Sequence, residues 1–155
     1  MEKHLPIKRH KSLRPLSRDH HFGLLLCWKI RQGFKNKVDV QRIKSYTDWY
    51  WQHHLNQHFE EEERIIFPIL GSENEKVKKA LAEHRRLKRL FEDFSEPTKS
   101  LSLIEEELEQ HIRFEERVLF NEIQSMATQM QLDVLEEHIH QHSYCENWED
   151  KFWEK

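Results

Sequence analysis

The sequence is poor in the residues that build turns, disulfides and membrane spans. Its 155 residues include three glycines, four prolines and two cysteines. So few turn-forming residues favour helices over a fold of many short strands. Cys27 and Cys145 cannot make a disulfide framework and do not form a Cys-x-x-Cys pair, which fits a reducing cytoplasm. No apolar run approaches the roughly 20 residues of a membrane span, and the N-terminus lacks the apolar core of a signal peptide. We therefore expect a cytoplasmic protein that does not enter the membrane.

Charge is abundant but balanced. Charged residues make up 34% of the chain, and the formal net charge is −3, which gives no reason to expect a nucleic-acid partner. The first 15 residues are basic, and we interpret them as a solvated arm. The basic residues of this arm are Lys3, Lys8, Arg9, Lys11 and Arg14.

Apolar residues recur at steps of three and four, which predicts helices separated by short connections. A length of 155 residues fits one domain with a substantial core. Short connections make successive helices antiparallel neighbours. The sequence therefore predicts an all-α protein, with an up-down-up-down four-helix bundle over residues 16–127 and an amphipathic C-terminal helix within 128–155, packed on the same domain. The expected helices run from about 17 to 34, from 39 to the Pro68–Gly71 region, from a Ser72–Glu75 capping box to about 94, from a Ser102–Glu105 capping box to about 126, and from 133 to 153.

Two of the expected helices carry the same motif, His-x-x-x-Glu-Glu-Arg-x-x-Phe. It begins at His58 in the second helix and at His111 in the fourth. Residues four apart lie on one face of a helix, so His58 points with Glu62, and His111 with Glu115. Both pairs fall on the apolar stripe, where an unpaired carboxylate is costly to bury. A metal cluster is the simplest source of compensating charge.

The first and third helices each add a histidine to the apolar stripe, His20 and His84. Four imidazoles and two carboxylates would then converge, which suits two metal ions that share the carboxylates. Imidazole with carboxylate is typical of iron or manganese sites, and the lack of thiolates argues against structural zinc. Acidic runs are often solvated faces, but the helical period places Glu62 and Glu115 on the buried side.

This pattern of a first-helix histidine, two His-x-x-x-Glu pairs and a third-helix histidine resembles the hemerythrin-like, or HHE cation-binding, domain. The resemblance covers about Leu16 to Met126, and it implies a non-haem di-iron centre in a four-helix bundle. The segments that carry it are Arg18-Asp-His-His21, His58 to Pro68, Ala82-Glu-His84 and His111-Ile-Arg-Phe-Glu115-Glu. The ligands implied by the resemblance are His20, His58, Glu62, His84, His111 and Glu115.

The sequence departs from the oxygen-carrying members in the third helix. Those members have two ligand histidines there, spaced His-x-x-x-His, whereas His84 has Lys88 at i+4 and Ala80 at i−4. Reversible oxygen transport is therefore not expected. The six-ligand HHE type is associated with sensing or handling oxygen, nitric oxide, peroxide or iron.

Residues close to the predicted ligands are alternative ligands or could form hydrogen bonds that support the ligands. Taking His20 as the inward residue gives a stripe of small or apolar residues, whereas His21 would bring Arg31 into the core. We therefore predict that His20 is the ligand and that His21 points sideways. His54 and Glu107, each one turn before a motif histidine, join His21 as candidates for contacts that support the ligands.

The sequence is compatible with three functions. The first is a protein that holds two irons and binds or senses a diatomic molecule, peroxide or iron. The second is an enzyme that reduces oxygen or peroxide at the same site. The third is a metal-stabilised interaction module, which light scattering with and without metal would test. Manganese or zinc could replace iron, and a monomer or weak homodimer is expected.

Overall fold

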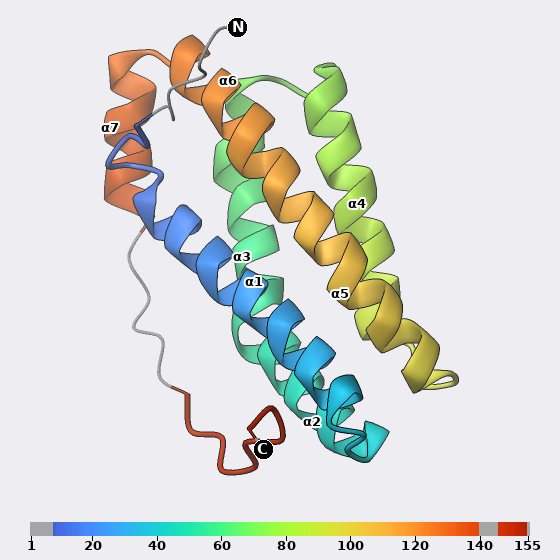
Figure 1. The fold of residues 1–155 in the computed structure, drawn as a ribbon. Helices are drawn as coiled ribbons and strands as arrows, with labels where there is room; N and C mark the ends of the chain where they lie inside the picture. The colour runs from blue at the N-terminus through green and yellow to red at the C-terminus, as the bar shows by residue number, and fades with distance from the viewer. Residues whose placement is uncertain (1–7, 140–145, 155) are drawn as a thin grey trace, which may run out of the picture.

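The computed structural model describes residues 8–139 and 146–154, and within these ranges every regular element is a helix (Figure 1). The elements are α1 (Arg14–Lys35), α2 (Val40–Tyr50), η1 (Trp51–Leu55), α3 (Asn56–Glu61), η2 (Glu62–Ile66), η3 (Phe67–Ile69), α4 (Glu75–Phe91), α5 (Pro97–Phe114), η4 (Glu115–Leu119), α6 (Phe120–Met126) and α7 (Gln129–His138).

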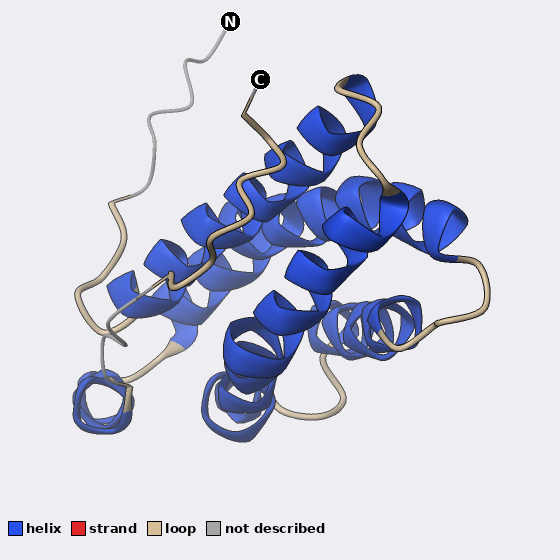
Figure 2. Ribbon diagram, turned by 90° about the horizontal axis from the view of Figure 1, so that it is seen from below, coloured by secondary structure: helices blue, strands red, loops and turns tan. Residues whose placement is uncertain are grey.

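Several of these elements follow one another without a break. The segments α2 to η3 form one long helix, and α5, η4 and α6 form another. With α1 and α4 they make the four helices of the bundle, and α7 packs at one end (Figures 1 and 2). The predicted all-α fold, a four-helix bundle with an additional helix, is confirmed.

Short polar side chains begin two of the bundle helices. Asp39 caps α2 by accepting a hydrogen bond from the backbone N–H of Gln41, and Asn74 caps α4 in the same way. The predicted capping boxes at Ser72 and Ser102 are wrong. The fourth helix begins five residues earlier than Ser102, at Pro97, because proline fits the first helical turn, where its missing N–H costs nothing.

Three stretches of the long helices are π-helical, with backbone bonds to the fifth residue rather than the fourth. Two of them, η2 and η4, begin at Glu62 and Glu115, the equivalent carboxylates of the repeated motif. Such single turns are rare and recur at functional sites. The repeat in the sequence is therefore also a repeat in backbone geometry.

The hydrophobic core is divided into two clusters. The first, which includes Leu26, Leu55 and Leu108, fills one end of the bundle, and the second, which includes Leu16 and Ile66, fills the other. Each bundle helix contributes to both. In each helix the inward histidine or His–Glu pair lies close to the point where residues of one cluster give way to residues of the other, so a polar layer lies between the clusters.

The C-terminal helix is shorter than predicted. It ends at His138, residues 140–145 are outside the described residues, and residues 146–154 follow the bundle without helical structure (Figure 2). Phe152 is buried in the first cluster, far from Leu135 in the second. The Lys29–Glu146 ion pair, at 2.8 Å, holds the start of this tail against α1.

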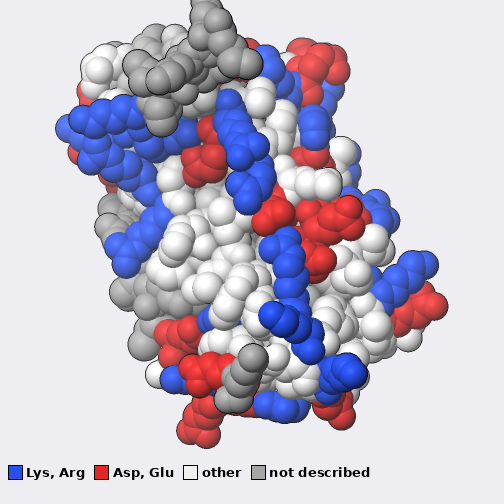
Figure 3. Space-filling model, viewed as in Figure 1, with Lys and Arg blue, Asp and Glu red and all other residues white. Residues whose placement is uncertain are grey.

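The basic arm predicted over residues 1–15 is not solvated throughout. In the described part, Ser12 and Leu13 are buried, and the Arg9 side chain is 15% exposed because it lies against α6 and η4. Lys8 and Lys11 do face solvent. Elsewhere on the face in Figure 3, groups of both signs alternate, in keeping with the small net charge.

Within the described ranges, each helix is too short or too polar to cross a bilayer.

Candidate metal centre

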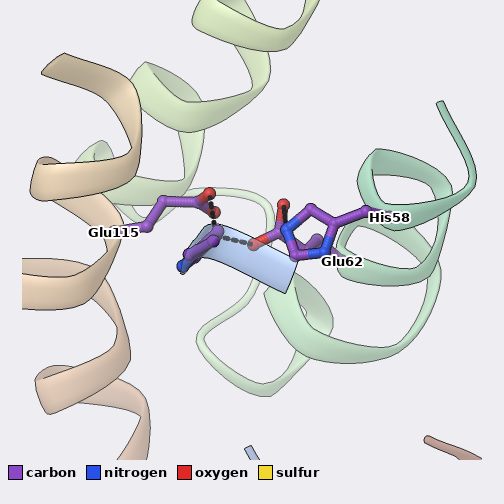
Figure 4. A group of neighbouring side chains, drawn as sticks. His58, Glu62 and Glu115 are labelled. Carbon is purple, nitrogen blue, oxygen red and sulfur yellow. Dashed lines mark hydrogen bonds and ion pairs between the residues drawn. The ribbon is translucent and has the colours of Figure 1, made fainter. Parts of the chain in front are cut away.

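Six polar side chains from the four bundle helices meet in the layer between the two apolar clusters. Each is 3% exposed or less, and Glu62 and Glu115 are fully buried. Glu62 and Glu115 point toward one another from different helices, with His58 beside Glu62 (Figure 4). The six residues are His20, His58, Glu62, His84, His111 and Glu115, and we call them the inner six.

The inner six divide into two groups that share both carboxylates. The first contains His20 and His58 with the two glutamates, and the second contains His84 and His111 with the same two. In each group, the four ligand atoms lie within 4.8 Å of one another. The nitrogen–oxygen distances are 3.2 Å from His58 Nε2 to Glu62 Oε1 and 2.9 Å from His111 Nε2 to Glu115 Oε1. Two adjacent cation positions bridged by carboxylates fit this arrangement.

The inward nitrogen and oxygen atoms of the inner six make few hydrogen bonds with one another. Four inward atoms have no hydrogen-bond partner among the described residues: His58 Nε2, both oxygens of Glu62, and Glu115 Oε2. In the second group, two nitrogens face each other, with His84 Nε2 lying 3.1 Å from His111 Nε2. Buried polar atoms are normally hydrogen-bonded, and the Glu62 oxygens have only ion-pair contacts with the surrounding histidines, so this cluster is a candidate site for bound cations.

Every histidine of the inner six presents its Nε2 inward and its Nδ1 to a further carboxylate. We call these four the outer carboxylates. Each accepts a hydrogen bond from a histidine on a neighbouring helix. The pairs are Asp19 with His58 (3.0 Å), Glu63 with His84 (2.9 Å), Glu83 with His111 (2.7 Å) and Glu116 with His20 (2.9 Å). The pairs close a ring around the bundle, in which each helix supports the histidine of the next.

The outer carboxylates were not predicted, although the sequence contains a signal for them. Asp19 and Glu83 directly precede His20 and His84, while Glu63 and Glu116 directly follow Glu62 and Glu115. Adjacent residues on a helix are about 100° apart, so when one points inward the other faces the neighbouring helix. An acid beside each inward residue is therefore well placed to bond a histidine on the next helix.

The predicted supporting residues lie elsewhere. His21 is exposed, and its ring contacts Phe22. His54 packs its ring against Trp49 and Tyr50. Glu107 forms a two-point ion pair with Arg86, with both nitrogen–oxygen distances 3.0 Å.

Burial and carboxylates act in opposite directions on the histidines. Burial lowers the pKa of His111, but Glu115 and Glu83 outweigh it and raise that pKa to about 10. The pKa values of His20, His58 and His84 are raised for the same kind of reason. Burial would raise the pKa of Glu115, but His111 and His20 hold it well below its usual range. Without metal, imidazolium groups therefore compensate the buried carboxylates.

No thiolate takes part in either group of ligands among the described residues. Cys27 is fully buried in the first apolar cluster, and burial raises the pKa of its thiol to about 12. Imidazole and carboxylate are thus the available donors, a set that suits iron or manganese.

Metal-free protein should lose stability as the pH rises from 6 to 9. The raised histidine pKa values contribute stability that is complete below 6.5, the value in the unfolded chain, and is lost as the pH approaches the folded value, about 10 for His111. The loss from His111 alone should be on the order of 3 kcal/mol at pH 9. Metal binding needs neutral imidazole, so the stabilisation by metal should increase over the same range. Urea denaturation at both pH values, with a chelator and with metal, measures both effects.

The control for this pH effect is a pair of histidine variants. His111→Ala should reduce the pH dependence of the metal-free protein, whereas His21→Ala, on the exposed side of α1, should leave it unchanged. A metal-free protein that becomes more stable between pH 6 and pH 9 would contradict the assignment of charged histidines.

Four antiparallel helices around buried histidines and shared glutamates define a helical-bundle protein whose core contains a candidate cation site. A family model described as the hemerythrin HHE cation-binding domain matches residues 15–105. The match covers more than half of the chain, which therefore belongs to this family. It includes His20, His58, Glu62 and His84, while the structure adds His111 and Glu115 to the same site. No curated protein and no solved structure matched the chain.

Proposed function

We propose that the chain holds two iron ions, one between His20 and His58 and one between His84 and His111. Glu62 and Glu115 would bridge them. The observation that supports this most directly is that both glutamates belong to both groups of ligand atoms. Both oxygens of Glu62 and Oε2 of Glu115 are buried without a hydrogen bond, and two adjacent cations would satisfy them.

The donor set favours iron or manganese over structural zinc, and membership of the hemerythrin family favours iron of the two. Imidazole nitrogens and carboxylate oxygens without thiolate suit iron or manganese, while structural zinc sites are typically richer in cysteine. When bound, a pair of irons supplies one-electron redox chemistry and coordination positions for a small ligand. Metal analysis of protein purified anaerobically from iron-replete cells tests this choice, and manganese or zinc in place of iron would revise it.

The proposed role is to bind or sense a small oxidant such as oxygen, nitric oxide or peroxide. The inner six are at most 3% exposed, so only a small molecule fits beside them without opening the bundle. On α4, one turn from His84 in either direction, stand Ala80, which is buried in the second cluster, and Lys88, which is exposed. Neither adds a donor, which leaves room for an external ligand. We place this activity in the cytoplasm, in a monomer or weak homodimer.

We expect the reduced, iron-loaded protein to be oxidised by oxygen rather than to carry it reversibly. The chain supplies fewer nitrogen donors than the oxygen carriers, so coordination positions on the metals would stay open to a water or oxygen molecule. Optical spectra recorded after oxygen exposure and again under vacuum measure the reversal. Full recovery of the reduced spectrum under vacuum would show that the protein is an oxygen carrier.

Sustained consumption separates sensing from catalysis at the same site. A sensor that has reacted with the oxidant should be re-reduced only slowly, so consumption should fall, after about one equivalent per reduced centre, to the background rate of the reductant alone. An oxidase or peroxidase should continue to consume oxygen or peroxide for many equivalents per chain. An oxygen electrode with excess reductant distinguishes the two, and continued consumption would replace the sensing proposal with the enzymatic one.

A further inference from the structure

Arg9, in the segment before α1, reaches one of the outer carboxylates. Its Nη2 donates to Glu116 Oε2 at 2.9 Å, while the other oxygen of that carboxylate, Oε1, accepts from His20 Nδ1 at 2.9 Å. Its Nη1 donates to Asn121 at 3.2 Å and to Gln124 at 2.9 Å. Glu116 is thus held from both sides, by a guanidinium and by an imidazole.

The π-helical turn provides a second attachment point for Arg9. The N–H of Phe120 donates to the carbonyl of Glu115, five residues earlier. In an α-helix it would donate to the carbonyl of Glu116, which instead accepts from Arg9 Nη2 at 2.7 Å. Arg9 therefore bonds both the backbone and the side chain of Glu116.

Arg9 also lies over the ring that packs on His20. Its guanidinium is 5.5 Å from the centroid of the Phe120 ring, and Phe120 stacks on the His20 ring at 5.2 Å. Both contacts that hold His20 from its outer side, Glu116 and Phe120, are therefore contacted by Arg9.

The other three histidines are supported from within the bundle. Their carboxylates, Asp19, Glu63 and Glu83, bond the histidines without a residue from outside the helices, and Glu83 has an additional ion pair with Lys79 of its own helix. In the described ranges, Arg9 is the one side chain outside the bundle helices that bonds an outer carboxylate. Arg9 also precedes the family match, which begins at residue 15.

We propose that Arg9 is a positioning residue for the metal site. It holds Glu116 and Phe120 in place, so that His20 presents its Nε2 to the cation between His20 and His58. This inference rests on the proposed two-metal function. A carboxylate that accepts from the outer nitrogen of a ligand histidine fixes its orientation, and loss of such a partner typically weakens metal binding by about 10–100-fold. Without Arg9, the partly exposed Glu116 side chain is free to turn toward solvent and leave His20 Nδ1 without its acceptor.

The test is stepwise titration of the full-length metal-free protein with Co²⁺, whose visible spectrum reports each site. Wild type should bind two ions. In Arg9→Gln, one of the two affinities should fall by about 10-fold or more, and the other should stay within about 2-fold. Glu116→Gln should reproduce this loss of affinity. The double variant Arg9→Gln/Glu116→Gln should lose little more, because both substitutions break the same chain of contacts from Arg9 through Glu116 to His20. Lys11→Gln, which removes the same charge from the same segment at an exposed position, is the matched control.

A second measurement separates positioning from a purely structural role. In ¹⁵N-histidine-labelled protein, the Nδ1–H of His20 should exchange with water faster in Arg9→Gln, while the Nδ1–H signals of His84 and His111 should not change. The proposal is overturned if Arg9→Gln lowers only the free energy of unfolding with both Co²⁺ affinities intact, or if both affinities fall equally. If wild type itself does not bind two ions, the proposed function fails instead, which the first titration shows.

Discussion

Glu62→Gln should abolish metal binding at both positions, whereas His58→Ala should weaken only one. Glu62 belongs to both ligand groups and His58 to the first alone. An amide of the same size keeps the packing but removes the bridging carboxylate. We expect the metal content to fall from about two ions per chain to well below one in Glu62→Gln, and to about one in His58→Ala. The loss should exceed the roughly 10–100-fold that accompanies the removal of an outer partner. Elemental analysis after equilibration with a limiting chelator measures it.

The control for this prediction lies on the same helix. Glu60 is an exposed carboxylate two residues from Glu62, and Glu60→Ala should leave the metal content unchanged. Circular dichroism should show that all three variants remain helical. Equal metal contents in Glu62→Gln and Glu60→Ala would refute the shared-carboxylate centre.

Iron-loaded protein should melt well above metal-free protein. Metal binds the folded bundle, because the six donors are brought together only by the four helices. At a free metal concentration of about 1,000 times the Kd, one site stabilises the fold by about 4 kcal/mol. For a chain of this size, that corresponds to a rise in Tm of roughly 8–16 °C. Differential scanning calorimetry of anaerobic samples, with and without Fe²⁺, measures the difference.

The matched comparison uses the double variant His58→Ala/His111→Ala, in which each group has lost a histidine. Its Tm should respond little to the same iron concentration. Equal melting points for metal-free and iron-saturated wild type would mean that the metal, if bound, sits on the surface rather than in the buried layer.

The bundle and the inner six could be predicted because they follow from periodicity. Each helix carries apolar residues at steps of three and four, and the inward histidines and glutamates fall on the same stripe. The choice of His20 over His21 depended only on helical phase, and the structure places His20 inward at 3% exposure and His21 on the exposed side. Which side chains share one face of a helix can be predicted without knowing how the neighbouring helices pack.

Features that depend on contacts between helices could not be predicted in this way. The outer carboxylates face the next helix, so their partners are set by bundle packing rather than by spacing. The aromatic residues near the C-terminus have a pattern that fits a helix, but Phe152 and Trp153 pack on Tyr46 from a non-helical tail. The contact of Arg9 with Glu116 joins residues at opposite ends of the bundle sequence. Tertiary contacts decided each of these cases.

The ring of outer carboxylates gives the site an approximate two-fold symmetry. Exchanging the first helix with the third, and the second with the fourth, carries Asp19–His58 onto Glu83–His111 and Glu63–His84 onto Glu116–His20. Glu62 and Glu115, each the first residue of a π-helical turn, exchange as well. One helical hairpin with an acid–histidine pair on its first helix and His-x-x-x-Glu-Glu on its second therefore contains half of the centre. Two identical copies, related by a rotation axis along the bundle, would complete it as an isologous dimer. In the single chain, Arg9 breaks this symmetry because it bonds Glu116 and has no counterpart at Glu63 within the described residues. The two proposed metal positions therefore have similar ligand geometry but different surroundings.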